Sequence, residues 1–167
     1  MADTKLAYQA VQTLTNAIEG LASSATWVAG YESTWIDNGT SLYLDYFFQG
    51  RVTVGTNPTA NTEIRIYVVT SVDDGTTYPD VFDGTTSAET VTSEGVRDGF
   101  AKLAAVLRCD ATTSDRVYPF AFSVASLFGG VCPPDFCLFV THNTGVALNA
   151  TGGNQVFKYR GVYATTA

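Results

Sequence analysis

The amino-acid sequence predicts an all-β fold, an antiparallel jelly-roll β-sandwich of about eight strands that follows an N-terminal helix or extended arm. Several segments alternate apolar and polar residues with the period of two expected of half-buried strands. Clusters of Asp, Asn, Gly and Pro separate these segments, and the helix–strand alternation typical of parallel sheets does not occur. The 167 residues fit one domain, so we assign residues 1–24 to the arm or helix and residues 25–167 to the jelly roll.

The first segment, residues 3–22, is the only one with helical spacing. Its apolar side chains recur at every fourth residue, at Leu6, Ala10, Leu14 and Ile18. Thr13, Thr15 and Asn16 are poor helix formers, so an extended arm is the alternative. In either conformation the apolar stripe needs a partner, which is the core of this chain, a neighbouring subunit or another protein surface.

The remaining elements are expected to be strands. In chain order we expect them over residues 27–35, 42–55, 63–71, 100–109, 116–127, 136–142, 146–148 and 155–164. Gly50 inside the second strand predicts a bulge or bend, and Pro119 predicts an edge strand or a bulge. The spacing over residues 100–109 fits a helix as well as a strand, and the β context favours a strand. The long connection between residues 71 and 100 suits a Greek-key crossover.

The sequence argues against nucleic acid and membrane as partners. Hydrophobic residues make up 46% of the chain and charged residues only 15%, with a net charge of −7. The nine Lys and Arg residues are scattered singly between Lys5 and Arg160, so we expect no nucleic-acid binding, which requires clustered cations. We expect no membrane partner, because the longest apolar stretch is shorter than a span of roughly 20 residues. The first residues lack a secretory signal pattern, which predicts synthesis in a cytoplasm.

The sequence indicates no catalytic, cofactor or metal residues, and we expect a protein that is not an enzyme. The richest acidic segment contains Asp73, Asp74, Asp80 and Asp83 but lacks the EF-hand pattern, so turn formation is favoured over cation binding. His142 is the single histidine. Its odd spacing from Cys137 would place the two side chains on opposite faces of a strand, which argues against a Cys–His nucleophile pair. The cysteines at 109, 132 and 137 lack zinc spacing. They are expected to be buried thiols, with a Cys132–Cys137 disulfide as the alternative.

Five aromatic residues lie close together in the sequence and allow two interpretations. These residues are Trp27, Tyr31, Trp35, Tyr43 and Tyr46. Aromatic rings stack on sugars, and many jelly rolls are lectins, so a carbohydrate platform is one interpretation. A sandwich core or a subunit interface, where Tyr and Trp are also enriched, is the favoured one.

Four blocks of the sequence resemble small structural proteins of tailed phages. They are Tyr78–Gly84, Ser87–Val91, Ser123–Gly130 and Leu138–Asn154, and the resemblance extends over about residues 35–164. Where the role of such proteins is known, they resemble jelly-roll cement (decoration) proteins of the phage head. The resemblance defines no catalytic residues.

The resemblance implies a location on the virion and two kinds of partner. Such a protein is made in the host cytoplasm, docks on the outer surface of the head and ties together neighbouring subunits of the major capsid protein. It is also expected to form a homodimer or homotrimer. Our candidate interface residues are Leu6, Leu14, Ile18 and Tyr159. The alternative function is a receptor- or carbohydrate-binding module of a tail spike or fibre.

Overall fold

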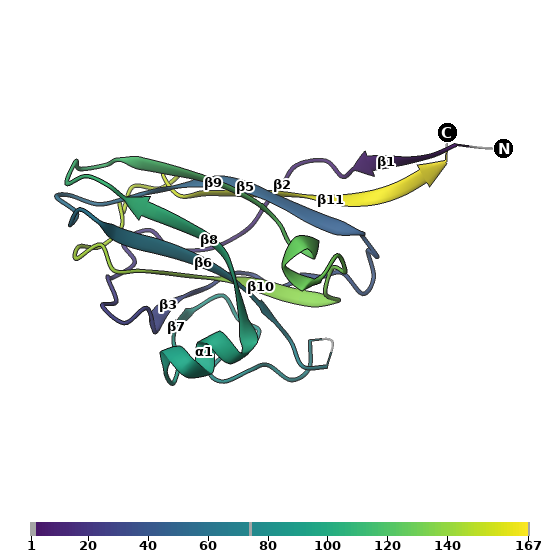
Figure 1. The fold of residues 1–167 in the computed structure, drawn as a ribbon, viewed down its shortest axis with the longest axis horizontal. Helices are drawn as coiled ribbons and strands as arrows, with labels where there is room; N and C mark the ends of the chain where they lie inside the picture. Colours follow the sequence, from purple (N-terminus) through teal and green to yellow (C-terminus); the bar gives the residue numbers. More distant parts are fainter. Residues whose placement is uncertain (1–2, 74, 167) are drawn as a thin grey trace.

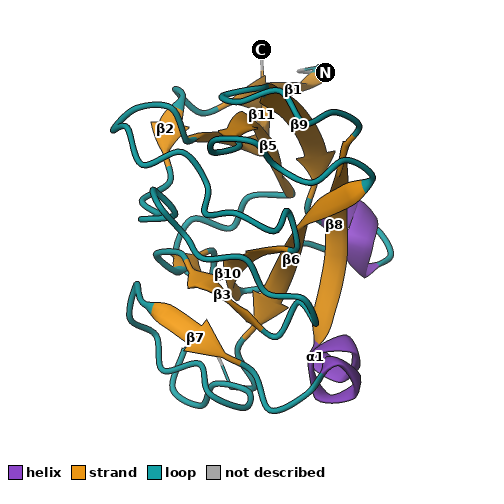
Figure 2. Cartoon of the chain, turned by 90° about the vertical axis from the view of Figure 1, so that its left-hand side faces the viewer, coloured by secondary structure: helices purple, strands orange, loops and turns teal. Residues whose placement is uncertain are grey.

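The computed structural model describes residues 3–73 and 75–166, and it confirms the all-β prediction. Two antiparallel sheets pack face to face as separate layers (Figures 1 and 2). The strands are β1 Thr4–Tyr8, β2 Gln12–Thr13, β3 Ala29–Glu32, β4 Ile36–Asp37, β5 Asp45–Thr53, β6 Thr62–Thr70, β7 Ala88–Thr90, β8 Ala101–Cys109, β9 Val117–Ser123, β10 Asp135–His142 and β11 Val156–Thr166. The α-helix α1 spans Glu94–Phe100, and the 3-10 helix η1 spans Ala125–Phe128. No helix in this described part of the chain is long and apolar enough to cross a membrane.

The strand order is that of a jelly roll. The first sheet has the order β1-β11-β5-β9, with β2 also paired to β11, and the second has the order β7-β3-β10-β6-β8, with β4 paired to β10. Eight of the strands form nested antiparallel pairs, β2 with β11, β3 with β10, β5 with β9 and β6 with β8. This nesting is a long hairpin wrapped into two sheets, which is the jelly-roll architecture. The short strands β1, β4 and β7 are additions to it.

The N-terminal segment is extended, so the helical alternative is wrong for it. Its backbone hydrogen-bonds along β11, as in the bond from the Leu14 amide to the Phe157 carbonyl (3.0 Å). Leu14 and Ile18 are buried in the core between the sheets. A spacing of four is an even number, so it also fits one face of an extended chain, and the poor helix formers decide between the two. The segment is therefore part of the sandwich.

The core between the sheets follows the predicted alternation along β5. Tyr46, Phe48 and Val52 are buried, whereas Phe47 on the opposite parity is exposed. The predicted bulge or bend at Gly50 is wrong, because β5 pairs in regular register with β9 and β11 through this residue. A Cβ atom there would collide with the Val156 carbonyl oxygen and would lie 2.7 Å from the Phe120 ring. Close packing of neighbouring groups is therefore the reason for glycine.

The long connection, residues 71–100, covers the outer face of the second sheet. It links the adjacent strands β6 and β8, so the predicted crossover is wrong, and on the way it adds β7 beside β3 at the opposite side of the sheet. Phe82 and Val91 from this covering segment pack with Tyr67 and Phe139 in a second core. Burial on both faces explains why the whole of β10 is buried and mostly apolar.

Two further predictions concern single elements. Residues 101–109 form strand β8, as favoured, and β9 with Pro119 lies at an edge of its sheet, as predicted. The preceding helix α1 was not predicted. The Ser93 hydroxyl accepts a hydrogen bond from the Val96 amide and caps this helix, which is the sequence feature that could have indicated it.

Candidate functional site

A two-stranded ribbon, formed by β1 and the end of β11, projects beyond the sandwich (Figure 1). We call β1 and the paired residues 162–166 of β11 the terminal ribbon. Leu6 and Tyr8 lie on it with exposed fractions of 65% and 59%. β1 ends its sheet, so within the described residues no strand pairs with its outer edge. The ribbon thus offers apolar side chains and unpaired backbone groups together.

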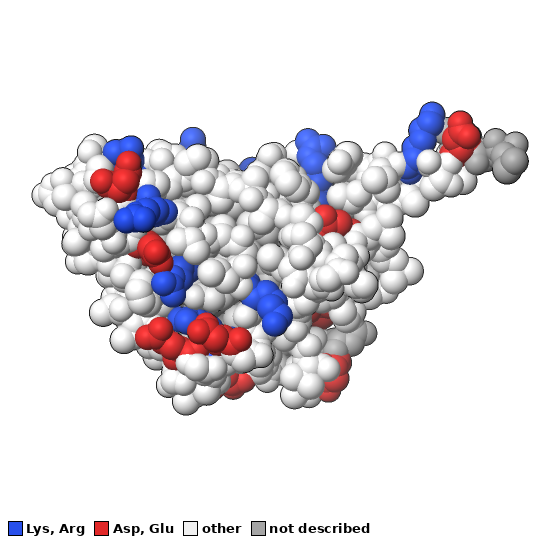
Figure 3. All heavy atoms as spheres, viewed as in Figure 1, with Lys and Arg blue, Asp and Glu red and all other residues white. Residues whose placement is uncertain are grey.

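An open groove of about 660 Å³ lies where the terminal ribbon leaves the sandwich. Leu6, Tyr8 and Val162 line it from the ribbon, and Leu44 and Phe47 line it from β5 and the residues before it. The walls are mostly apolar, so the groove extends the apolar surface of the ribbon onto the sandwich. Figure 3 shows broad uncharged areas between few charged side chains on one face of the molecule.

The four predicted interface residues differ in exposure. Leu6 is exposed on the terminal ribbon, whereas Leu14 and Ile18 have exposed fractions of only 4% and 0% and pack in the core. Tyr159 is half-buried against Tyr46 and Phe48. In this conformation Leu14 and Ile18 contact their own chain, so we no longer place them at an interface with a partner.

Sequence reasoning missed Tyr8, Leu44 and Phe47 as surface candidates. Phe47 occupies the outward parity of β5, between the core residues Tyr46 and Phe48. The sequence could have indicated Phe47, because it is an aromatic residue at one of the outward-facing, mostly polar positions of an alternating strand. Leu44 is exposed because the inward alternation begins only at Tyr46.

The aromatic residues considered for sugar stacking do not form an exposed platform. Tyr46 is buried, and the other four are half-buried. The guanidinium of Arg65 lies 3.8 Å from the centroid of the Trp27 ring, and Trp35 packs edge-on against Tyr78. The rings of Trp27 and Trp35 therefore pack against other residues of the fold.

Two acidic residues of the covering segment accept hydrogen bonds from within that segment. Asp73 accepts hydrogen bonds from Thr77, four residues further on, as the favoured turn interpretation predicted. Asp80 instead accepts two from Thr92, twelve residues further on, and so links two parts of the segment, and Asp74 lies outside the described residues. Asp83 alone joins a cluster, which sequence reasoning did not find.

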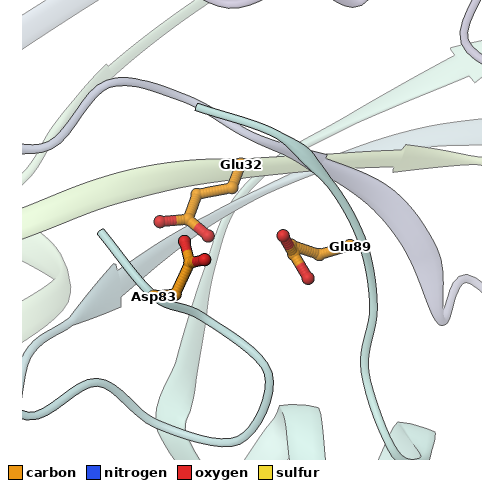
Figure 4. Close-up of side chains that lie close together, drawn as sticks. All are labelled: Glu32, Asp83 and Glu89. Carbon is orange, nitrogen blue, oxygen red and sulfur yellow. The ribbon is translucent and has the colours of Figure 1, made fainter. Parts of the chain in front are cut away.

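Glu32, Asp83 and Glu89 form this carboxylate cluster at the edge of the second sheet. Figure 4 shows their carboxylates converging from β3, the covering segment and β7. One oxygen from each residue lies within 4.8 Å of the others. Glu32 is fully buried, Glu89 is half-buried and Asp83 is exposed, so the cluster extends from the protein interior to solvent.

Burial raises the pKa of Glu32 from 4.5 to about 7. The hydrogen bond from the Trp35 indole lowers it, whereas the negative charges of Glu89 and Asp83 raise it further. The backbone N–H of Gly84 also lowers the pKa slightly. By contrast, hydrogen bonds from Thr85 lower the pKa of Asp83 and so favour its charged form.

The cysteines and the histidine lie in places that suit structure rather than nucleophilic chemistry. All three cysteines are free, so the disulfide alternative is wrong. Burial raises the pKa of Cys132 to about 12 and that of Cys109 to about 11, which disfavours the reactive thiolate. Cys137 packs in the second core, whereas the buried His142 bonds through Nε2 to the Leu21 carbonyl (3.0 Å). Burial lowers the pKa of His142.

Comparisons of the chain with protein-family models, with curated proteins and with solved structures found no match in any of the three. The resemblance to phage cement proteins therefore stays a prediction based on the four sequence blocks.

Proposed function

We propose that this chain is a structural decoration protein that docks on the outer surface of a tailed-phage head and bridges neighbouring subunits of the major capsid protein. The observation that carries the proposal is the terminal ribbon, which projects from the sandwich with Leu6 and Tyr8 exposed. The jelly-roll fold and the resembling sequence blocks agree with it. The proposed role is mechanical and requires no catalysis.

The ribbon supplies two kinds of contact to a capsid protein. The outer edge of β1 can pair with an extended capsid segment, because an edge strand presents unpaired N–H and C=O groups. Leu6, Tyr8 and the apolar groove then bury side chains of the same segment. Backbone pairing supplies affinity, and the groove supplies specificity.

Bridging requires at least two such contacts in one particle. We propose that the chain forms a homodimer or homotrimer, so that each assembly presents two or three ribbons. Once one ribbon has docked, the next binds at a high effective concentration and the combined affinity rises by roughly 10²–10⁴-fold. This gain ties adjacent capsomers together against the pressure of packaged DNA.

Co-sedimentation with purified phage heads that lack the protein tests the proposal. We expect wild-type chain to pellet with expanded heads, and the double variant Leu6→Thr/Tyr8→Thr to bind at least about tenfold more weakly. Threonine keeps the β propensity of the ribbon. Val72→Thr is the matched control, because Val72 is 72% exposed but lies in the covering segment. Absence of wild-type binding, or equal binding by the double variant, would contradict the proposal.

No observation favours the alternative of a carbohydrate-binding module of a tail spike or fibre. Its motivating aromatic residues are buried or half-buried within the fold. A glycan array that gave reproducible hits for the wild-type chain, together with location at the tail, would nevertheless select it over the decoration function.

A further inference from the structure

We propose that Glu32, Asp83 and Glu89 bind a hard divalent cation of the Ca²⁺ type. The inference concerns the carboxylate cluster and is independent of the proposed function. It assigns a ligand to three acidic residues that neither the terminal ribbon nor its groove contains.

The cluster has the dimensions of a cation site. Ca²⁺ binds carboxylate oxygens at roughly 2.3–2.6 Å, so oxygens that share one ion lie at most about 5 Å apart. One oxygen from each of the three residues falls within 4.8 Å of the others. All the ligand atoms are oxygens. Ca²⁺ and Mg²⁺ prefer oxygen donors, whereas many transition metals prefer nitrogen or sulfur donors. Asp83 is exposed, so water can complete the coordination from the solvent side.

Each carboxylate is held by a neighbouring donor that leaves its second oxygen available. The Trp35 indole donates to Oε1 of Glu32, the Thr85 hydroxyl donates to Oδ1 of Asp83 (2.6 Å), and the Ser87 hydroxyl donates to Oε1 of Glu89 (2.6 Å). These bonds orient the three groups before any ion arrives. Such supporting bonds are typical of carboxylates that ligate metals.

Glu32 supplies an independent indication of a missing partner. Its side chain is fully buried, and among the described residues no donor, the Gly84 N–H included, meets hydrogen-bond geometry with its Oε2 atom. Buried polar atoms are nearly always satisfied, so this oxygen requires an explanation. Figure 4 shows the Glu32 carboxylate directed toward Asp83. The unsatisfied atom therefore belongs to the group that faces the other two carboxylates.

Among the residues that the structure describes, no basic side chain forms an ion pair with the cluster. The charged groups that act on Glu32 are Glu89 and Asp83, which are both acidic. The salt bridges formed by the described residues include none of the three. A shared proton would neutralise one charge and connect one pair of oxygens. A divalent cation would neutralise two charges and contact all three residues, which accounts for the three-way convergence.

A bound ion would join the covering segment to the sheet. Glu32 belongs to β3, whereas Asp83 and Glu89 belong to the segment that covers the outer face of the sheet. Existing links between them include the bond from the Glu32 amide to the Ser87 carbonyl (2.8 Å) and the pairing of β3 with β7. The ion would add a further link at this edge and slow its opening.

Terbium luminescence and calcium titration test the site in the full chain. Tb³⁺ replaces Ca²⁺ in oxygen sites, and Trp35 touches Glu32, so excitation of tryptophan should produce sensitised Tb³⁺ emission that Ca²⁺ displaces. Calorimetry should give one Ca²⁺ per chain, and Ca²⁺ should raise the melting temperature. Glu32→Gln should weaken Ca²⁺ binding by at least roughly 10–100-fold, the loss typical even when a group that only supports a metal ligand is changed.

Two further variants make the test decisive. Asp73→Asn is the matched control, because Asp73 is an acidic residue of the same covering segment whose carboxylate binds Thr77 outside the cluster. Asp73→Asn should keep both the sensitised Tb³⁺ emission and the rise in melting temperature with Ca²⁺. Glu89→Gln, at a half-buried position, should weaken Ca²⁺ binding if Glu32→Gln does not fold. The proposal is overturned if wild-type chain binds neither Tb³⁺ nor Ca²⁺ at millimolar concentration, or if Glu32→Gln and Glu89→Gln bind as wild type does.

Discussion

Replacing Glu32 with glutamine should change how the stability of the protein depends on pH. Burial raises the pKa of Glu32 from 4.5 to about 7 in the folded state, whereas in the unfolded chain the group titrates near its ordinary value. Between these two values the folded state binds more protons than the unfolded state. Stability therefore falls as the pH rises from about 4.5 to about 7, and it stays at the lower level above that.

The structure sets the size of this effect. One pKa unit corresponds to about 1.4 kcal/mol, so the shift of Glu32 destabilises the folded state at pH 8 by about 3 kcal/mol relative to pH 4. For a domain of this length that difference corresponds to roughly 6–12 °C in melting temperature. The glutamine side chain does not titrate, so the Glu32→Gln variant should lack this part of the pH dependence and exceed the wild type in stability at pH 8.

Urea denaturation in EDTA at several pH values between 4.5 and 8 measures the effect. The difference in free energy of unfolding between Glu32→Gln and wild type should grow by about 3 kcal/mol across this range. Hydrogen bonds from Thr77 lower the pKa of Asp73, so its contribution changes only toward acid pH, and Asp73→Asn should run parallel to wild type above pH 5. Parallel curves for Glu32→Gln and wild type would refute the reasoning. Addition of Ca²⁺ should restore wild-type stability most strongly at pH 8.

Three other predictions concern packing and the thiols. Gly50→Ala should lower stability by about 1–3 kcal/mol in urea denaturation, since its Cβ would collide with the Val156 carbonyl and the Phe120 ring; unchanged stability would contradict the close approach. Phe139→Ala should cost about 3–5 kcal/mol by the same measurement, because this fully buried ring is central to the second core; a loss below about 1 kcal/mol would show that the covering segment packs differently. In the native protein Cys132 should react slowly with a thiol reagent and all three thiols should react after unfolding, and fewer than three would indicate a disulfide.

Local alternation was sufficient to predict most of the longer strands and much of the inner core, whereas the strands β1, β2, β4 and β7 were not predicted and the expected strand over residues 146–148 is only an isolated bridge at Leu148. Tyr46, Phe48 and Val52 share one parity in the sequence and one buried face in the structure. Pro119 marked an edge strand because proline cannot donate a ladder hydrogen bond. Such features depend on residues close in sequence, which is why they could be predicted.

Features that depend on distant contacts were missed or misinterpreted. The role of Gly50 depends on Val156 and Phe120, which are far away in the chain. Glu32 lies in a strand region rich in aromatic residues, and its partners Asp83 and Glu89 reach it only because the covering segment crosses the sheet. No spacing in the sequence could reveal that convergence.

The terminal ribbon shows the same limitation at the surface. The spacing of Leu6, Leu14 and Ile18 at multiples of four residues predicted one continuous apolar stripe. The chain instead leaves the ribbon after Tyr8 and carries Leu14 and Ile18 into the core, so only Leu6 of the three stays exposed. The positions at which β1 and β2 pair along β11 decide which apolar residues remain exposed for a partner.

Cryo-electron microscopy of DNA-filled heads incubated with the chain tests the decoration function most directly. The proposal predicts density for the sandwich on the outer surface, at junctions between capsomers, with the terminal ribbon against the capsid protein. The Leu6→Thr/Tyr8→Thr variant should leave these positions empty at the same concentration. Heads without added density under saturating wild-type protein, or density confined to the tail, would contradict it.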